Sequence, residues 1–309
     1  MPRLTGPQPE VRARVGLTLV ELLITLTLLG VIGTILAQMM TDQQRFYHQT
    51  NETMGLRREL RSAMSLMPAD LRSVSSVGGD IISFSTTQIT FQATLGAGII
   101  CAKPNATTID LPPLNMARTT LVNWHTTPAV GDTLYAFRTD SMGAGGDSWT
   151  THRITSITPS ADYCPGSPFT DATLDAGKSR WRFTVTPAVA DSVKIGAAVR
   201  FGRSTQYSLV TGTSGKYFLG RAEYVGGAWT AATPIAGPFT APNSAGTGGL
   251  RFAMYDSTGG AVSPSGNLRG ISRIDLTLRG QGASSSGSVG GKTTAKDSIT
   301  FRIALRNRQ

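Results

Sequence analysis

A run of twenty uncharged residues near the N-terminus, Leu22–Thr41, constrains the fold of this chain more than any other feature. As a helix, this run would rise roughly 30 Å, which is the thickness of the hydrocarbon core of a bilayer. A buried helix of a water-soluble protein seldom extends so far without a charge. The sequence therefore predicts one membrane-spanning helix, with the span at about residues 17–41.

The residues that flank the run predict its orientation. Arg3, Arg12 and Arg14 precede it and are opposed only by Glu10, so the positive-inside rule places the N-terminus in the cytoplasm. We expect a single-pass protein of the cytoplasmic (inner) membrane with its remainder outside. A cleaved secretory signal would also start with basic residues, but it would end in small residues of the A-x-A kind. Residues 37–40 read AQMM, which argues against cleavage there.

A carboxylate, Glu21, lies at the edge of the apolar run, although a charge at mid-membrane depth costs about 2.5–3.5 kcal/mol. It ends the segment GLTLVE at residues 16–21, which follows the basic leader and enters the apolar helix directly. This arrangement resembles the processing motif of the type IV pilin and type II secretion pseudopilin superfamily. The resemblance implies that a prepilin peptidase cleaves between Gly16 and Leu17 and removes residues 1–16 as a leader peptide. It also implies N-methylation of the new first residue, which is commonly Phe in the family and is Leu17 here.

The position of Glu21 also has a physical interpretation. After cleavage, the amine of Leu17 and the carboxylate of Glu21 would lie one helical turn apart. In a staggered bundle, the carboxylate of an incoming subunit would neutralise the amine of its neighbour, and each charge is costly in lipid without a partner. We interpret Glu21 as an assembly residue. The implied partners are prepilin peptidase, other pilin or pseudopilin subunits, an inner-membrane assembly platform and the lipid bilayer.

Two glycines, Gly30 and Gly33, interrupt the apolar helix. In an aqueous helix each would cost about 1 kcal/mol relative to Ala. The family resemblance implies local melting of the helix near these residues when a filament forms. The alternative is a small-residue packing face of the kind that membrane helices use for close approach.

The predicted helix continues beyond the membrane as a stalk, at about residues 42–73. An apolar stripe of helical period predicts the face that packs on a globular domain; it consists of Leu56, Leu60, Ala63, Met64, Met67 and Leu71. The charged residues on the other faces are expected to be solvated or to contact other subunits. Pro68 predicts a boundary or a kink at Met67.

The remaining residues, 74–309, predict a β-rich extracytoplasmic head, and hence an α+β chain. Short alternating runs separated by turn residues predict strands at Ile81–Phe84, Gln88–Ala93, Thr133–Arg138, His152–Thr158, Arg180–Thr186, Ala198–Phe201, Gln206–Val210, Lys216–Tyr224, Leu250–Tyr255, Ile271–Arg279 and Ser298–Arg306. The Gly/Ser-rich stretch Gly280–Lys296 is expected to join the last two as a long loop. A long helix before a mainly antiparallel head is similar to the lollipop architecture of the superfamily.

Within that superfamily, the chain resembles most the larger W-type minor pilins and J-type pseudopilins. The resemblance rests on the size of the head, on Val130-Gly131-Asp132 before a strand, and on the closing residues 305–308, LRNR. It implies a structural subunit that joins or primes a type IV pilus or a type II secretion pseudopilus.

The two cysteines, Cys101 and Cys164, both lie in the predicted head, where oxidation is expected outside the cytoplasm. A bridge between them would close a loop worth about 4 kcal/mol in the chain-entropy model. We favour a disulfide over two buried thiols.

Other patterns do not predict an enzyme. Gly290-Gly291-Lys292-Thr293 is similar to the end of a phosphate-binding loop, but Ser286 replaces the required first Gly, and we expect a flexible loop. His48, His125 and His152 are scattered without the spacing of a metal site. We therefore predict no catalytic residue, no metal site and no cofactor.

Two alternative functions remain open. The formal net charge of +10 admits capture of DNA, as by a competence pilin, with Trp181, Tyr217 or Phe218 stacking on bases. The basic residues are dispersed along the sequence, however, and such an excess usually serves solubility. The other alternative is a signal-anchored extracytoplasmic enzyme or binding module, in which the helix is only a tether and Glu21 is replaceable.

Overall fold

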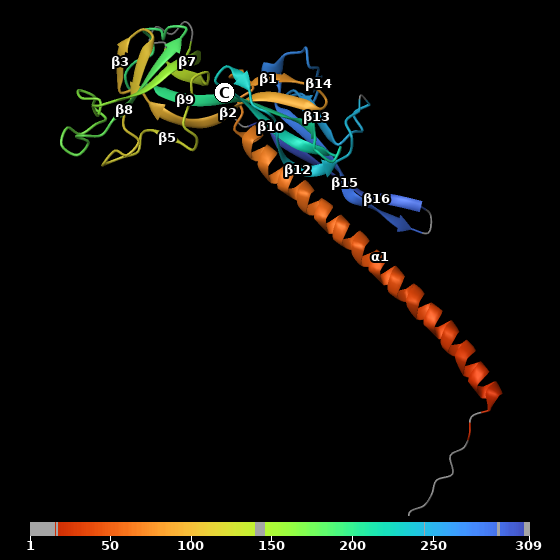
Figure 1. Ribbon diagram of the computed structural model, residues 1–309. Helices are drawn as coiled ribbons and strands as arrows, with labels where there is room; N and C mark the ends of the chain where they lie inside the picture. The colour runs from red at the N-terminus through yellow and green to blue at the C-terminus, as the bar shows by residue number, and fades with distance from the viewer. Residues whose placement is uncertain (1–15, 17, 140–145, 244, 289–290, 306–309) are drawn as a thin grey trace, which may run out of the picture.

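The computed structural model describes residues 16, 18–139, 146–243, 245–288 and 291–305. One helix, α1 (Leu19–Arg72), precedes sixteen strands that form one sheet, and every pairing between the described strands is antiparallel. The structure confirms the α+β class. Figure 1 shows α1 projecting from a head that contains all the strands.

Among the described residues, the strands follow one another through loops of varied length and one 3-10 turn at Leu268–Gly270. They are β1 (Ile81–Phe84), β2 (Gln88–Ile99), β3 (Ala102–Asn105), β4 (Thr108–Leu111), β5 (Asn123–Trp124), β6 (Thr133–Arg138), β7 (Ser148–Ser160), β8 (Arg180–Thr186), β9 (Ala198–Thr211), β10 (Tyr217–Val225), β11 (Ala228–Trp229), β12 (Thr233–Phe239), β13 (Leu250–Tyr255), β14 (Ala261–Val262), β15 (Arg273–Ser288) and β16 (Gly291–Ala304).

The C-terminal part of α1 packs on the head through the predicted apolar stripe. All six of its residues, from Leu56 to Leu71, are buried, which confirms the stripe. The expected boundary at Met67 is wrong, because the helix passes through Pro68 and ends at Arg72. A proline inside a helix costs about 3 kcal/mol. Met67 and Leu71, both fully buried, lie on either side of Pro68, and their burial offsets that cost.

The head contains two hydrophobic cores that share one sheet. We call the part that packs on α1 the stalk lobe; its core comes from α1, β1, β10, β12, β13, β15, β16 and one half each of β2 and β9. The outer lobe contains β3–β8 and the other halves of β2 and β9. Figure 1 shows β2 and β9 running from one lobe into the other.

The change of lobe within β2 takes place between Ala93, in the stalk-lobe core, and Leu95, in the outer-lobe core. The register between β2 and β9 shifts here, between Thr94 and Gly96. A Cβ on Gly96 would lie 2.3 Å from the carbonyl oxygen of Asn123. Glycine is therefore required for β5 to pass this closely.

Three predictions about the sheet need correction. The two strands predicted at 198–201 and 206–210 are one strand, β9, because Gly202 pairs with β2 on one side and with β6 on the other. The long loop predicted at Gly280–Lys296 is wrong, since β15 and β16 continue into this stretch as a hairpin. Lys292 and Thr293 consequently lie in β16 rather than in a flexible loop.

A chain of ion pairs connects α1 to the strands that cross between the lobes. Tyr207 donates its hydroxyl to Asp70 of α1 at 2.7 Å, and Arg221 lies 3.7 Å from the same carboxylate. Arg221 also pairs with Glu223, which in turn accepts from Arg203 at 3.1 Å. The end of the stalk is therefore held to the head by polar contacts as well as by its apolar stripe.

Candidate assembly surface on the N-terminal helix

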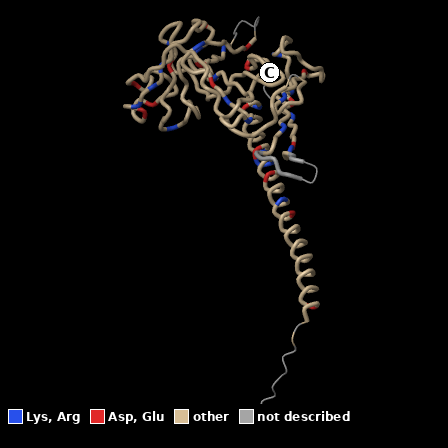
Figure 2. Tube along the Cα trace, turned by 45° about the vertical axis from the view of Figure 1, so that its right-hand side comes forward, with Lys and Arg blue, Asp and Glu red and all other residues tan. Residues whose placement is uncertain are grey.

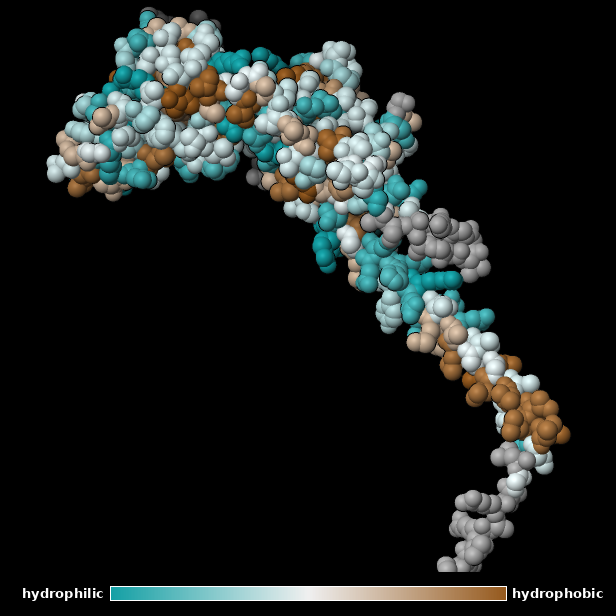
Figure 3. All heavy atoms as spheres, viewed as in Figure 1, coloured by the Kyte–Doolittle hydropathy of each residue, from teal (hydrophilic) through white to brown (hydrophobic). Residues whose placement is uncertain are grey.

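The N-terminal part of α1 is apolar on every side and is free of the head. Its large apolar side chains, from Leu19 to Met40, are each at least 52% exposed. Figure 3 shows brown atoms gathered at this end of the helix, which a hydrophilic stretch separates from the head. Among the described residues, α1 is the one helix long and apolar enough to span a membrane, by length and composition.

We call this exposed apolar part of α1 the bare segment. Its threonine hydroxyl groups donate hydrogen bonds to carbonyl oxygens within the helix. Thr25, Thr27 and Thr34 donate to the carbonyl oxygens three residues earlier at 2.8–3.0 Å, and Thr41 donates to Gln38 at 2.7 Å. A hydroxyl without a partner would cost several kcal/mol in hydrocarbon. The back-bonding therefore makes the segment compatible with lipid despite its four threonines.

The helix begins within the predicted processing motif. Thr18 is the N-cap, and its side chain accepts from the backbone N–H of Glu21 at 3.4 Å. The Glu21 carboxylate lies in the first turn, where the helix dipole favours a negative charge. Within the described part of the chain, this carboxylate forms no ion pair and no side-chain hydrogen bond.

Of the two residues at the predicted cleavage site, the structure describes one. Gly16 is described and exposed. Leu17, the predicted methylation site, and residues 1–15 of the predicted leader lie outside the described residues, as do residues 306–308 of the closing segment.

Gly30 and Gly33 lie in the middle of the bare segment, in uninterrupted α-helix. A Cβ added to either glycine would meet no atom within 4 Å. No described residue of this chain therefore requires glycine at either position.

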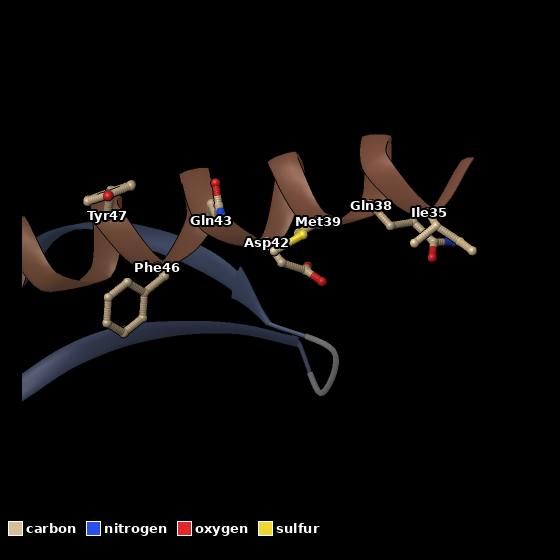
Figure 4. A pocket seen from close by; sticks show the side chains of 7 residues that line it. All are labelled: Ile35, Gln38, Met39, Asp42, Gln43, Phe46 and Tyr47. Atoms are coloured by element: carbon tan, nitrogen blue, oxygen red, sulfur yellow. The ribbon is translucent and has the colours of Figure 1, made fainter. Parts of the chain in front are cut away.

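The stalk between the bare segment and the head is polar, with two exposed aromatic residues. Asp42, which directly follows the apolar run, forms an ion pair with Arg45 at 3.7 Å. Phe46 and Tyr47 follow, 65% and 66% exposed. Figure 4 shows both side chains lining a hollow of about 560 Å³ on the helix, beside the ribbon of the β15–β16 hairpin.

The two cysteines are joined by a disulfide in the outer lobe. The Cα atoms of Cys101 and Cys164 are 6.4 Å apart, and the bond connects positions separated by 63 residues. It attaches the segment before β8 to the end of β2, far along the chain from α1.

The other candidate residues do not gather into a site. Trp181 in β8 packs edge-on against Trp124, at 5.6 Å between ring centroids, whereas Tyr217 and Phe218 lie in β10 of the stalk lobe. The structure does not bring these three predicted stacking residues together. His152 is buried and hydrogen-bonded to the carbonyl oxygen of Pro187 at 2.8 Å. Among the described residues, no group of three His, Cys, Asp or Glu side chains is arranged to hold a metal.

No protein-family model matches this chain, and neither a curated protein nor a solved structure matches it.

Proposed function

We propose that this chain is a minor pilin or pseudopilin, a structural subunit that joins or primes a type IV pilus or a type II secretion pseudopilus. In this proposal, a prepilin peptidase cuts between Gly16 and Leu17, and the new amine of Leu17 is methylated. The N-terminus is cytoplasmic and the head is extracytoplasmic. The helix and the head together form the lollipop of the superfamily.

The observation that carries the proposal is the division of one unbroken helix into two surfaces. From Leu19 to Met40 the large apolar side chains of the helix are exposed, and its threonine hydroxyl groups donate hydrogen bonds within the helix. From Leu56 to Leu71 the helix packs on the head. A tether needs a membrane span, but it does not need the span and the head on one continuous helix of 54 residues. Such a helix would transmit the position of the head to neighbouring subunits.

Glu21 adds a second, independent argument. It is the only charged residue from Thr18 to Thr41, and it has no partner among the described residues. A carboxylate at this depth is costly in lipid unless a positive group neutralises it. The N-terminal amine of a neighbouring subunit supplies such a group.

The experiment is to measure incorporation of a tagged Glu21→Gln chain into sheared filaments in a cell that assembles them. The variant leaves the neighbour's amine unpaired, and an unpaired charge at mid-membrane depth costs about 2.5–3.5 kcal/mol. Incorporation should therefore fall at least about tenfold, with the amount in the membrane fraction unchanged. The matched control is Asp42→Asn, which makes the same chemical change at an exposed carboxylate beyond the apolar run and should incorporate normally. Normal incorporation of Glu21→Gln would contradict the proposal and favour a signal-anchored module.

A further inference from the structure

The outward face of three strands in the stalk lobe carries an unusual row of cations. Positions two residues apart along β15 point to the same face and lie about 6.6–6.8 Å apart. The ladder pairs these positions with outward residues of β13 and β16. We call this surface the basic face; its cations are Arg251, Arg273, Arg279, Lys296 and Arg302.

An outward residue of β15 and the residues of β13 and β16 that pair with it form one row across the basic face. Each of five successive rows contains one of these cations. Arg273 and Arg279 occupy two rows themselves. In the other three rows, the cation lies on a neighbouring strand. Asp275 pairs with Arg302, Thr277 pairs with Arg251, and Gln281 pairs with Lys296. The cations therefore form a regular track along the strands. Figure 2 shows Lys and Arg as blue segments at many places in the head.

The basic face is poorly neutralised compared with the outer lobe. Asp275 is the one carboxylate on it in these three strands, at 3.0 Å from Arg273 and 3.7 Å from Arg302. The neighbouring Asp297 turns to the other face and binds Arg57 of α1. In the outer lobe, by contrast, Arg180 and Arg182 share the buried Asp110 and other cations have carboxylate partners of their own.

The basic face is also hollowed and lined with hydrogen-bonding groups. One hollow of about 140 Å³ is lined by Arg251, Asp275, Thr277 and Thr300, among others. A second, of about 470 Å³, is lined by Arg279, Lys296, Asp297 and Ser298, among others. Guanidinium groups beside hydroxyl and amide groups match the oxygens of a phosphodiester.

A stacked pair lies at one end of the track. The guanidinium of Arg273 lies 4.1 Å from the centroid of the Tyr255 ring. Planar arginine and tyrosine groups are the surfaces on which nucleic-acid bases stack.

We propose that the basic face binds the phosphodiester backbone of nucleic acid, without sequence preference. The track follows the strands for several rows, so it fits a linear polymer better than a single phosphate. This inference does not depend on the assignment as a pilin, because it uses only residues of β13, β15 and β16.

The experiment measures binding of a fluorescein-labelled, mixed-sequence 20-nucleotide single-stranded DNA by anisotropy, with a duplex of the same sequence as a second probe. The full chain is held in nanodiscs of zwitterionic lipid, and the salt concentration is varied. The test variant combines Arg251→Gln, Lys296→Gln and Arg302→Gln, three exposed side chains. The matched control combines Arg58→Gln, Arg61→Gln and Lys194→Gln, which removes the same charge from exposed positions elsewhere.

The test variant should bind single-stranded DNA at least about tenfold more weakly at 0.1 M salt. The slope of log affinity against log salt should fall in magnitude by about 2, because three phosphate contacts are lost. The control variant should match the parent in both respects, and all three proteins should melt at the same temperature. Equal binding by test and control variants would overturn the proposal. Competition by polyglutamate as effective, per charge, as by unlabelled DNA would also overturn it, since the surface would then recognise charge alone.

Discussion

At the scale of single residues, Arg203 shows how the head places a charge in its interior. Its side chain is 8% exposed and donates twice to Asp132, at 2.9 and 2.8 Å, and once to Glu223. These hydrogen bonds raise the pKa of Arg203 above its ordinary value, although burial opposes them. An arginine in this setting stays charged and fixes the two carboxylates around it.

Glu223 makes the stability of the head dependent on pH. Burial alone would raise its pKa, but the hydrogen bond from Arg203 and the charge of Arg221 outweigh burial and hold the pKa below the ordinary 4.5. The folded state therefore binds this proton less readily than the unfolded state. The resulting stability is present above pH 4.5 and is lost as the pH falls through the lowered pKa.

We expect the free energy of unfolding to decrease as the pH falls below about 4.5, as measured by urea denaturation at several pH values. Glu223→Gln should lower stability at neutral pH and reduce the slope of stability against pH in the acid range. Asp191→Asn is the control, because that carboxylate is fully exposed and forms an ion pair with Lys103 on the surface. If Glu223→Gln left the slope of stability against pH unchanged, the ion pair would not contribute to the pH dependence of stability.

At the scale of elements, periodicity predicted those parts of the fold in which one face is buried. The apolar stripe of α1 and the strands β1, β6, β8 and β13 follow directly from their patterns. The pattern failed for β12, which contains Pro234 and Pro238 and pairs irregularly with β10. It failed also for the ends of β15 and β16, because a Gly/Ser-rich ladder is held by backbone hydrogen bonds that no side-chain pattern reports.

The candidate assembly surface was predictable to a similar extent. The uncharged run and the isolated Glu21 are visible in the sequence, because both are local. The basic face was not, since its cations come from three strands whose pairing depends on register over about fifty residues. The ion pairs of Arg203 with Asp132, 71 positions earlier, were hidden for the same reason.

The packing of α1 on the stalk lobe gives a prediction at this scale. Met67 is fully buried, whereas the adjacent Leu66 is 47% exposed. Met67→Ala should lower the free energy of unfolding of the head by about 2–5 kcal/mol, because it leaves a cavity between the helix and the sheet. Leu66→Ala should change it by less than about 0.5 kcal/mol. Equal effects in thermal melts would mean that the helix does not pack as described.

At the scale of the whole molecule, two cores share one sheet, but only one of them contacts the stalk. The outer lobe is joined to the stalk lobe through β2 and β9 and through the ion pairs around Arg203. Its disulfide closes a loop within the outer lobe alone. We therefore expect perturbations of the outer lobe to leave the helix and its packing intact.

The double variant Cys101→Ser/Cys164→Ser tests this separation. It should destabilise the outer lobe by about 4 kcal/mol, the value expected for a loop of this length. Trp124 and Trp181 pack against the outer-lobe core, so tryptophan fluorescence should report its earlier unfolding. Hydrogen exchange in α1 between Leu56 and Leu71 should stay at the parent level. Faster exchange there would contradict the independence of the two cores.

The central claim is that α1 belongs to a processed filament subunit, and the mature N-terminus tests it most directly. The measurement is intact-mass and peptide mass spectrometry of the chain expressed with its prepilin peptidase, beside a Gly16→Ala control. The proposal predicts a chain that starts at Leu17, carrying one extra methyl group, and no such species in the control. An uncut chain, or a cut after the apolar run that ends at Thr41, would contradict it.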